Sequence, residues 1–348
     1  EIAKLYSADD TSPTIAIAAT NGISAVTDGD TSNDAALTLT FTSSEATSNF
    51  AVEDITVSGG AISNFSATSS TVYTATFTPS SSGATTIDVA ANKFTDAVGN
   101  NNTAADQFNW TFDNVAPTIS AITTSAFSWG SSLNAIEDNS DGTVTVTTSG
   151  AEDGQTVTIT LNSATYTANV SSNSATVTIL TAGLQELTDG NTYSLTADVS
   201  DMVGNAATQV ISSSFSVDTS LPTISAIATS AFSWGSSLNA TEDNSDGTVT
   251  VTTSGAEDGQ AVTIILNSAT YTANVNSNSA AITINAAALQ ALTDGNTYTL
   301  TADVTDVAGN AATQVTSSSF LYDVSTPTIV ISVKEGNNSI SDGDYINE

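Results

Sequence analysis

TVTVTT (143–148) alternates valine with threonine, and TVTIT (156–160) repeats the alternation a few residues later. A period of two is typical of a β-strand with one buried face and one solvent-exposed face. Such stretches recur along the chain, separated by Gly, Asn, Asp and Ser, and 39% of all residues are hydrophobic. The sequence therefore predicts an all-β protein that folds despite its high charge.

A Pro-Thr-Ile motif divides the chain into units of similar length. Its prolines are Pro13, Pro117, Pro222 and Pro327, which lie 104, 105 and 105 residues apart. Residues 117–221 and 222–326 match at most positions, and a fixed period of this kind indicates a tandem array. We predict the end of a preceding repeat or a linker at 1–11, a first repeat at 12–115, a second at 116–220, a third at 221–325, and the start of an incomplete fourth repeat at 326–348.

Each repeat is predicted to contain about seven short strands. In the second repeat we expect strands at 118–124, 142–149, 156–162, 165–170, 175–180, 192–200 and 207–217, with a single helical turn within AGLQELTDG (182–190). This number of strands predicts tandem immunoglobulin-like β-sandwiches. DGNTY (294–298), like DGNTY (189–193), has the spacing of a tyrosine corner. The chain has no cysteine, which excludes an antibody-type disulfide but not the sandwich.

Several stretches resemble a known family. EDGQTVTITLNSATYTANV (152–170), LTDGNTYSLTADVSDMVGN (187–205) and SFSVDTSLPTI (214–224) are similar to the Ig-like repeats of giant bacterial surface adhesins and biofilm-associated proteins. FAVEDITVSGG (50–60) and FTDAVGN (94–100) resemble a sister group of bacterial Ig-like domains. The resemblance implies an extender, or stalk, segment at the bacterial cell surface or in the extracellular space, supporting adhesion or biofilm formation, often with calcium at the domain junctions.

The charge balance limits the possible partners. Three basic residues stand against 36 acidic ones, so the formal net charge is −33. Such a chain is repelled by nucleic acid and by anionic membranes, and no apolar run is long enough to insert directly into a membrane. We expect the partners to be neighbouring repeats of the same chain, together with other cells, surface glycans or like chains in a filament.

The acidic residues cluster where repeats should meet. NAIEDNSDGTV (134–144) recurs as NATEDNSDGTV (239–249), and no Lys, Arg or His lies between Asp113 and Pro327. Chain direction in an Ig sandwich brings the loop after the first strand and the exit linker of one repeat close to two loops of the next. Oxygen ligands favour Ca²⁺, whereas zinc and copper prefer Cys or His. The predicted ligands are Asp9, Asp96 and Asn100 at the front; Asp28, Asp30, Asp34, Asp113, Glu152, Asp153, Asp201 and Asn205 at the first–second junction; Glu137, Asp138, Asp141, Asp218, Glu257, Asp258, Asp306 and Asn310 at the second–third junction; and Glu242, Asp243, Asp246 and Asp323 at the back.

Three other functions are weighed against a calcium-stiffened stalk. An enzyme is not expected, because acid–base catalysis needs a unique constellation and these acids recur in near-identical loop copies. A subunit of an extracellular filament, sheath or S-layer stays open. A glycan-binding module also stays open, because Trp129 and Trp234 in AFSWGSS could stack on a sugar, although packing inside the sandwich is the interpretation we favour for both. Trp110 aligns with Phe215 and Phe320, so we expect it in a core.

Overall fold

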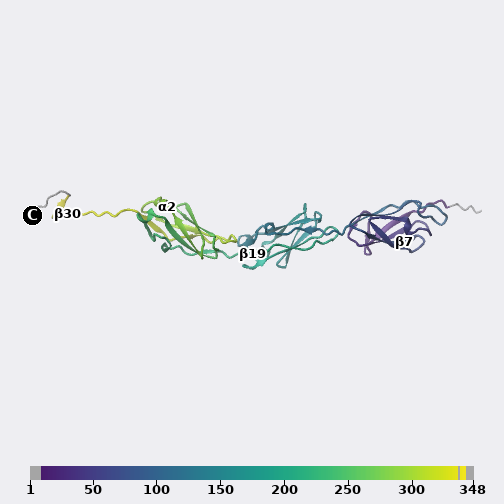
Figure 1. Cartoon of the computed structure of the whole chain (residues 1–348), viewed down its shortest axis with the longest axis horizontal. Helices are drawn as coiled ribbons and strands as arrows, with labels where there is room; N and C mark the ends of the chain where they lie inside the picture. The colour runs from purple at the N-terminus through teal and green to yellow at the C-terminus, as the bar shows by residue number, and fades with distance from the viewer. Residues whose placement is uncertain (1–8, 336–337, 342–348) are drawn as a thin grey trace, which may run out of the picture. The chain divides into compact units, whose positions relative to one another are not determined.

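A computed structural model describes residues 9–335 and 338–341 (Figure 1). Residues 1–8 of the predicted preceding segment, and residues 336–337 and 342–348 of the predicted fourth repeat, lie outside the described residues. The chain forms two compact units. Unit I runs through Ser131 and adds Asp141–Gly183 and Tyr193–Phe215, whereas unit II combines Ser132–Ser140, Leu184–Thr192 and the residues from Ser216 onward.

Two sheets form the N-terminal part of unit I. The first has the order β2-β1-β4-β7-β6, with β1 at Ile15–Thr20, β2 at Ala25–Val26, β4 at Leu37–Ser43, β6 at Gly60–Ala67 and β7 at Val72–Pro79. The second has the order β3-β9-β8-β5, with β3 at Thr31–Ser32, β5 at Ile55–Ser58, β8 at Gly83–Val89 and β9 at Phe108–Phe112; the 3-10 turn η1 (Val52–Asp54) precedes β5. Neighbouring strands are antiparallel, except that β3 runs parallel to β9.

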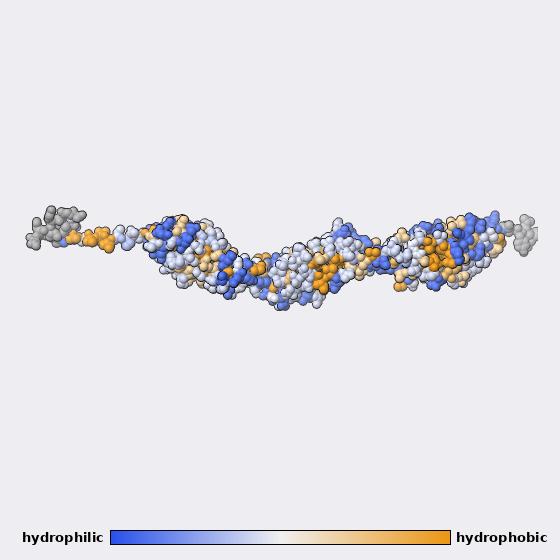
Figure 2. Space-filling view, viewed as in Figure 1, coloured by the Kyte–Doolittle hydropathy of each residue, from blue (hydrophilic) through white to orange (hydrophobic). Residues whose placement is uncertain are grey.

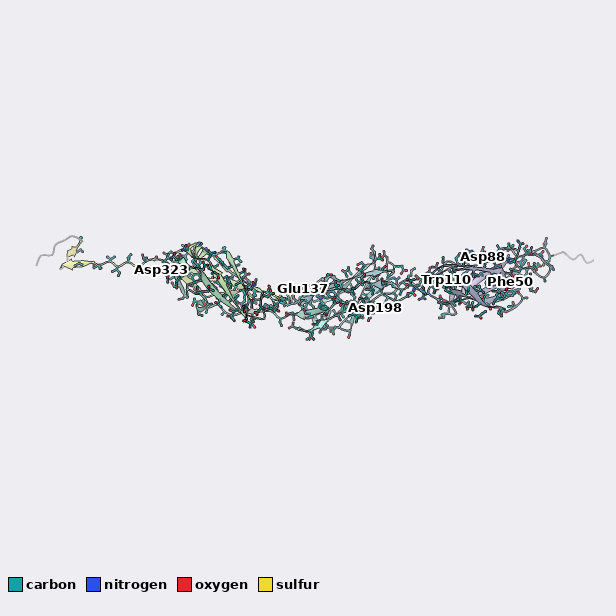
Figure 3. All side chains as sticks on the ribbon, viewed as in Figure 1. Phe50, Asp88, Trp110, Glu137, Asp198 and Asp323 are labelled. Atoms are coloured by element: carbon teal, nitrogen blue, oxygen red, sulfur yellow. The ribbon has the colours of Figure 1, made fainter. Side chains whose placement is uncertain are left out.

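Alternating side chains of these two sheets form one apolar core. In β4, Leu37, Leu39 and Phe41 have no exposed surface, whereas the threonines between them are exposed or half-buried. Trp110 in β9 is 1% exposed, and its Nε1 donates to Ser32 Oγ at 3.1 Å. Figure 3 labels Trp110 within this sandwich. The predicted core position of Trp110 is therefore confirmed.

The rest of unit I contains two further sheets. One has the order β10-β12-β15, with β10 at Thr118–Ile119, β12 at Gly142–Ser149 and β15 at Ser174–Ile179. The other has the order β14-β13-β17-β18, with β13 at Thr156–Leu161, β14 at Ala164–Asn169, β17 at Thr196–Asp198 and β18 at Val210–Ile211. The 3-10 turn η2 (Thr124–Ala126) precedes β12, and the short helix α1 (Thr181–Gln185) follows β15. The strands predicted at 142–149, 156–162, 165–170 and 175–180 are confirmed to within one residue at each end.

Unit II contains the corresponding sheets of the third repeat, together with one sheet, β11-β19-β16, whose strands come from the second repeat. The sheet orders are β11-β19-β16, β20-β22-β25, β21-β29-β26 and β24-β23-β27-β28. Their strands are β11 (Ser132–Asn134), β16 (Thr192–Tyr193), β19 (Phe215–Asp218), β20 (Thr223–Ile224), β21 (Ser237–Asn239), β22 (Gly247–Ser254), β23 (Ala261–Leu266), β24 (Ala269–Asn274), β25 (Ser279–Ile284), β26 (Thr297–Tyr298), β27 (Leu300–Asp303), β28 (Val315–Thr316) and β29 (Phe320–Asp323). The remaining elements are the 3-10 turns η3 (Glu137–Asn139), η4 (Thr229–Ala231) and η5 (Glu242–Asn244), the helix α2 (Ala286–Gln290), and the hairpin of β30 (Val333–Glu335) and β31 (Asn338–Ile340). Buried residues from β20 to β29 form one apolar cluster, as in a sandwich.

Of the other predicted strands of the second repeat, two are broken in the structure and one is shorter than predicted. The prediction at 192–200 becomes β16 and β17, the prediction at 207–217 becomes β18 and β19, and the prediction at 118–124 ends with β10 at Ile119. The third repeat shows the reason: β26 pairs with β29, whereas β27 pairs with β23 and β28, so the chain changes neighbours between them. The alternation of apolar and polar residues predicts which side chains of a strand are buried, but it does not predict which neighbouring strand pairs with it.

Both tryptophans of the AFSWGSS motif lie inside the protein. Trp129 and Trp234 are each 5% exposed, and they stack on Phe127 and Phe232 at ring-centroid distances of 5.2 and 5.3 Å. Gly247 is required by this packing, because a Cβ there would lie 2.4 Å from the ring of Trp234. Neither indole presents a face to a sugar, so the observation that motivated a glycan-binding module is removed.

Polar and apolar side chains are distributed over the surface in separate areas. Figure 2 shows polar side chains over most of the visible surface, with apolar patches separated from one another. Within the described ranges, no helix has the length and apolar composition needed to cross a membrane.

Two tyrosines of the third repeat hold its loops in place. Tyr298 Oη accepts the backbone N–H of Thr293 at 2.8 Å, which confirms the tyrosine corner predicted at 294–298. The hydroxyl of Tyr322 donates to Asp243 Oδ2 at 2.8 Å, and both residues are buried. Burial, together with this hydrogen bond, raises the pKa of Tyr322 to about 12.

The second repeat lacks the Tyr–Asp hydrogen bond. Val217 stands 105 residues before Tyr322, in the place that the tyrosine takes in the third repeat. The equivalent of Asp243 is Asp138, whose Oδ1 is buried and has no hydrogen-bond partner. Burial raises the pKa of Asp138. Because the second repeat has Val217 where the third has Tyr322, the buried Oδ1 of Asp138 has no hydrogen-bond donor.

We predict that Tyr322→Phe destabilises the third repeat. The substitution removes one donor and leaves Asp243 Oδ2 buried without a partner, which costs about 1–3 kcal/mol. Hydrogen exchange should show faster opening of β22 and β25, while the equivalent strands β12 and β15 keep their rate. Unchanged exchange in β22 and β25 would mean that the Tyr–Asp contact contributes nothing to stability.

We also predict that this contribution disappears in alkali. Because the pKa of Tyr322 is raised from the ordinary value of about 10 to about 12, the folded state keeps the proton that the unfolded state has lost. The stability advantage of the natural protein over Tyr322→Phe should therefore be complete below about pH 10 and decline as the pH rises toward about 12. Denaturant titrations of both proteins across this range measure the difference, and a constant difference contradicts the prediction.

Candidate metal sites at the repeat junctions

The same turn of sequence Asp-x-x-x-Asn stands near the end of each repeat. It occurs as DAVGN (96–100), DMVGN (201–205) and DVAGN (306–310). In the first copy Asp96 Oδ1 accepts the backbone N–H groups of Val98, Gly99 and Asn100 at 2.7–2.9 Å. Although desolvation by itself raises the pKa of Asp96, these hydrogen bonds and that of the Asn100 side chain outweigh it and lower the pKa. The turn thus holds an ionised, buried aspartate.

The asparagine of each turn reaches the segment that enters its repeat. The side-chain Nδ2 of Asn310 donates to the backbone carbonyl of Asp218 at 2.8 Å. The equivalent bonds join Asn205 to the carbonyl of Asp113 and Asn100 to the carbonyl of Asp9, each at 3.0 Å. The predicted meeting of the turn with the linker aspartate is therefore present three times, through an amide and a backbone carbonyl.

In the second and third repeats, a glutamate from another loop accepts a hydrogen bond from the same turn. Glu257 Oε2 accepts the backbone N–H of Val307 at 2.9 Å, and Glu152 Oε2 accepts that of Met202 at the same distance. These two bonds place both glutamates beside their turns, as the loop arrangement of a sandwich predicts.

The environment of Asp218 is the most crowded of these places. Partial burial raises the pKa of Asp218, and the charges of Asp306, Asp189 and Glu257 raise it further, against the opposing effect of the Ser220 N–H. A pocket of about 430 Å³ lies here, and Asp189, Asp218 and Glu257 line it. Four carboxylates of unit II thus share one region, with no basic side chain in the sequence between Asp113 and Pro327.

Asp189 is a residue that the sequence analysis missed. Its two carboxylate oxygens accept from Ser220 Oγ and from the backbone N–H of Thr219, each at 2.7 Å. These two donors lower the pKa of Asp189. The residue belongs to DGNTY (189–193), which was interpreted only as a tyrosine corner. The recurrence of Asp-Gly in this loop of the second and third repeats was the available signal.

A second carboxylate cluster lies at the front of unit I. One oxygen each of Asp9, Glu45 and Asp96 lies within 4.8 Å of the others. Desolvation raises the pKa of Glu45, and the charges of Asp9 and Asp96 raise it further. Glu45 was not predicted, because it stands alone in FTSSEATSNF (41–50) with no motif around it.

Many of the other predicted residues accept hydrogen bonds from donors of their own repeat. Asp28 accepts from Asn109, Asp30 from Thr27, Asp34 from Ser32 and Asn21, Asp153 from Ser172, Asp258 from Ser277, Asp141 from Thr181, Asp246 from Ala286, Glu137 from Asn134, Glu242 from Asn239, and Asp323 from Ser325. Two donors from Thr181 lower the pKa of Asp141. Asp30 and Glu137 close their own turns, as acidic residues in turns often do. Asp28, Asp141 and Asp153 instead accept from residues 81, 40 and 19 positions away. These bonds do not test whether the same oxygens also bind a metal.

The donor set around Asp218 fits a hard divalent cation. It offers carboxylate and backbone carbonyl oxygens, and the chain contains no cysteine or histidine. Ca²⁺ takes six to eight oxygen ligands at about 2.3–2.6 Å. Burial and then nearby negative charge raise the pKa of Asp218, and a bound cation would oppose the second of these effects. Asp9, Glu45 and Asp96 offer carboxylate oxygens of the same kind.

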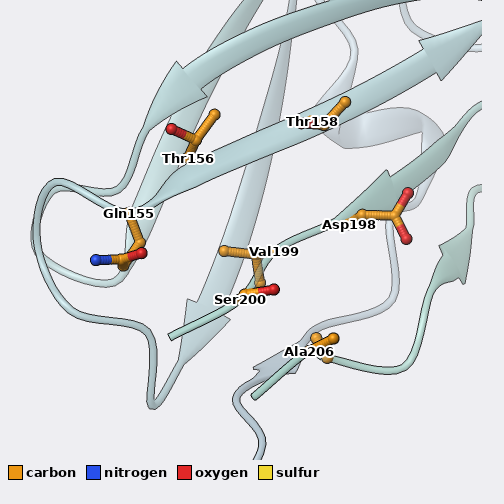
Figure 4. Close-up of a pocket in the computed structure, with 8 residues that line it drawn as sticks. Gln155, Thr156, Thr158, Asp198, Val199, Ser200 and Ala206 are labelled. Atoms are coloured by element: carbon orange, nitrogen blue, oxygen red, sulfur yellow. The ribbon is translucent and has the colours of Figure 1, made fainter. Parts of the chain in front are cut away.

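A pocket beside β13 and β17 of unit I does not have the carboxylate-rich lining found beside Asp218. It has a volume of about 290 Å³ and is lined by Gln155, Thr156, Thr158 and Asp198 together with smaller side chains (Figure 4). Asp198 is its titratable residue, and both of its oxygens accept from Gln209 Nε2, at 3.1 and 2.8 Å. The lining therefore does not bring several carboxylates together, as the pocket beside Asp218 does.

Comparisons with known proteins agree with the sandwich fold. A bacterial Ig-like domain model matches residues 9–112, and a model of the bacterial Ig-like domain (group 3) matches residues 69–216, 176–335 and 289–348. Comparison with curated proteins gave no match.

Solved structures of bacterial adhesins are similar to this chain. A structure of a 1.5-MDa bacterial ice-binding adhesin is 20% identical, over 91% of this chain and 100% of that one, with a TM-score of 0.41. A Ca²⁺-stabilized adhesin of an Antarctic bacterium is 21% identical, over 93% and 77%, with a TM-score of 0.43. A bacterial Ig-like domain of the M. primoryensis ice-binding adhesin is 26% identical over 29% of this chain and 95% of that one, with a TM-score of 0.22.

Because these TM-scores lie below 0.5, the family assignment depends on the sequence models. Those models together extend from residue 9 to residue 348. The protein belongs to the bacterial Ig-like domain family.

Proposed function

We propose that this chain is an extender segment of a large extracellular or cell-surface bacterial adhesin, with Ca²⁺ stiffening the junctions between its repeats. The tandem Ig-like repeats and the resemblance to adhesin and biofilm repeats support the stalk role. In that role the repeats hold an adhesive region away from the cell, and their first partners are the neighbouring repeats. The observation that carries the calcium role is the crowding of Asp218 by three other carboxylates.

Electrostatic energy gives the reason for a cation. Two carboxylates about 4 Å apart repel each other by about 1–4 kcal/mol near a protein surface. Only a proton or a cation can remove this repulsion where the chain supplies no basic side chain. Extracellular modules bind Ca²⁺ with dissociation constants of about 10⁻⁴–10⁻³ M, and a ligand at a hundredfold its dissociation constant stabilises the bound form by about 2.7 kcal/mol. That is enough to keep a junction closed.

The calcium ligands that we propose for the three junctions differ from those predicted from the sequence. The proposed ligands are Asp189, Asp218, Glu257 and Asp306 at the second–third junction; Asp113, Glu152 and Asp201 at the first–second junction; and Asp9, Glu45 and Asp96 at the front. Asp141 and Asp153 are given a structural role instead, because they connect their loops to Thr181 and Ser172 of the same repeat.

We predict that Asp218→Asn combined with Glu257→Gln removes one bound calcium per chain. Two of the four carboxylates at the junction lose their charge, so the affinity of this site should fall by at least about tenfold, equivalent to about 1.4 kcal/mol. Isothermal titration calorimetry measures the stoichiometry and the affinity. The control is Asp153→Asn combined with Asp258→Asn, which removes the same charge from two carboxylates outside the proposed ligand sets. Equal calcium binding by the two double variants contradicts the assignment.

We predict that calcium narrows the range of conformations of the whole chain in solution. Small-angle X-ray scattering should give a larger maximum dimension in millimolar calcium than in chelator, because bound ions restrict bending at each junction. Magnesium at the same ionic strength is the control, since it demands a regular octahedral site and keeps its waters. A scattering curve that does not change between calcium and chelator counts against stiffening.

A further inference from the structure

Every polar atom of the Asn310 side chain has a hydrogen-bond partner. One N–H bond of its amide donates to Asp306 Oδ2 at 2.9 Å, and the other to the backbone carbonyl of Asp218 at 2.8 Å. Its Oδ1 accepts the backbone N–H of Ala135 at 2.7 Å. The side chain is 1% exposed. A single amide therefore joins its own turn, the linker, and the loop that follows β11.

The orientation of this amide is fixed by chemistry. A rotation that exchanged its oxygen and nitrogen would aim the oxygen at two acceptors, the Asp306 carboxylate and the Asp218 carbonyl. It would also aim an N–H group at the N–H of Ala135. All three contacts would become repulsive, so Oδ1 stays directed toward Ala135.

The first–second junction uses the same arrangement. Nδ2 of Asn205 donates to Asp201 Oδ2 at 2.8 Å and to the carbonyl of Asp113 at 3.0 Å, and its Oδ1 accepts Nδ2 of Asn33 at 3.2 Å. At the second–third junction a further amide adds to the contact: Nδ2 of Asn134 donates to the carbonyl of Ala308 at 3.0 Å. Each of these bonds joins one protein atom directly to another.

We propose that Asn205 and Asn310 are positioning residues that clamp the linker without a metal, rather than ligands of a calcium ion. The clamp holds each linker beside its turn before any ion binds, and the carboxylates supply the ligands. This inference deepens the proposed function, since clamp and ion act at the same junction. It changes the role given to both residues by sequence clustering, and it assigns to Asp201 and Asp306 the task of orienting the amide.

The variant Asn310→Asp distinguishes a calcium ligand from a clamp that acts through hydrogen bonds. If Asn310 were a ligand, an added carboxylate would strengthen calcium binding. If it is a clamp, the variant replaces an N–H donor by an acceptor that faces Asp306 and the Asp218 carbonyl, and the junction opens. The matched control is Asn274→Asp, which adds the same charge at the exposed end of β24.

The absence of cysteine makes the measurement direct. Spin labels on cysteines introduced at Thr167 and Thr272, both exposed, report the distance distribution between the second and third repeats of the full chain. In chelator, Asn310→Asp should raise the population outside the main distance peak by about tenfold, the factor that corresponds to about 1.4 kcal/mol. Asn274→Asp should leave the distribution unchanged.

A second variant guards against local unfolding of the turn. Asn134→Ala removes the amide that reaches Ala308, and it lies outside the third repeat, so it cannot unfold that repeat from within. It should also broaden the distribution in chelator, while hydrogen exchange of β27 and β28 keeps its natural rate. Broadening by both variants supports the clamp.

Two results overturn the clamp: natural distributions for both variants in chelator, or tighter calcium binding by Asn310→Asp. The calcium role is judged separately, on the natural chain. If calcium fails to narrow its distribution while Asn310→Asp broadens it in chelator, the clamp stands and calcium stiffening does not.

Discussion

Between Lys93 and Lys334 the chain has no basic side chain, and this constraint decides how its carboxylates are satisfied. A buried or crowded carboxylate needs a donor or a cation, because an unpaired charge is costly to bury. With no lysine or arginine available, the donors must be backbone N–H groups, hydroxyls and amides. Asp96, Asp141 and Asp189 are satisfied in this way, and their pKa values are lowered.

Two other carboxylates have a raised pKa although they lie beside these: Asp218 lines the same pocket as Asp189, and Glu45 belongs to the same cluster as Asp96. Asp218 and Glu45 have raised pKa values, and in both cases other carboxylates contribute after burial. Both lie beside a turn whose asparagine reaches a linker carbonyl. The same few residues of each repeat therefore bring together a hydrogen-bonded connection and a concentration of negative charge. The hydrogen bond to the linker and the nearby negative charge are thus found at one turn, which recurs in each of the three repeats.

The sequence predicted the strands whose side chains alternate in one sheet, such as 142–149, and the core position of Trp110. It did not predict where β16 gives way to β17, because burial continues while the pairing partner changes. For the site, the linker aspartates and the turn motif were predicted correctly as neighbours. Asp189 and Glu45 were missed, since each comes close only through the folding of distant loops. Asp28 and Asp153 were predicted from clustering in the sequence, which does not reveal that Asn109 and Ser172 are their hydrogen-bond donors.

We propose that the carboxylates around Asp218 hold a divalent ion between successive repeats. Anomalous diffraction from crystals of the chain grown in millimolar calcium can locate such an ion. We predict a peak coordinated by Asp218 and Glu257, with oxygen distances of about 2.3–2.6 Å. If no peak is found and these carboxylates are separated and hydrated, the proposed calcium role is wrong.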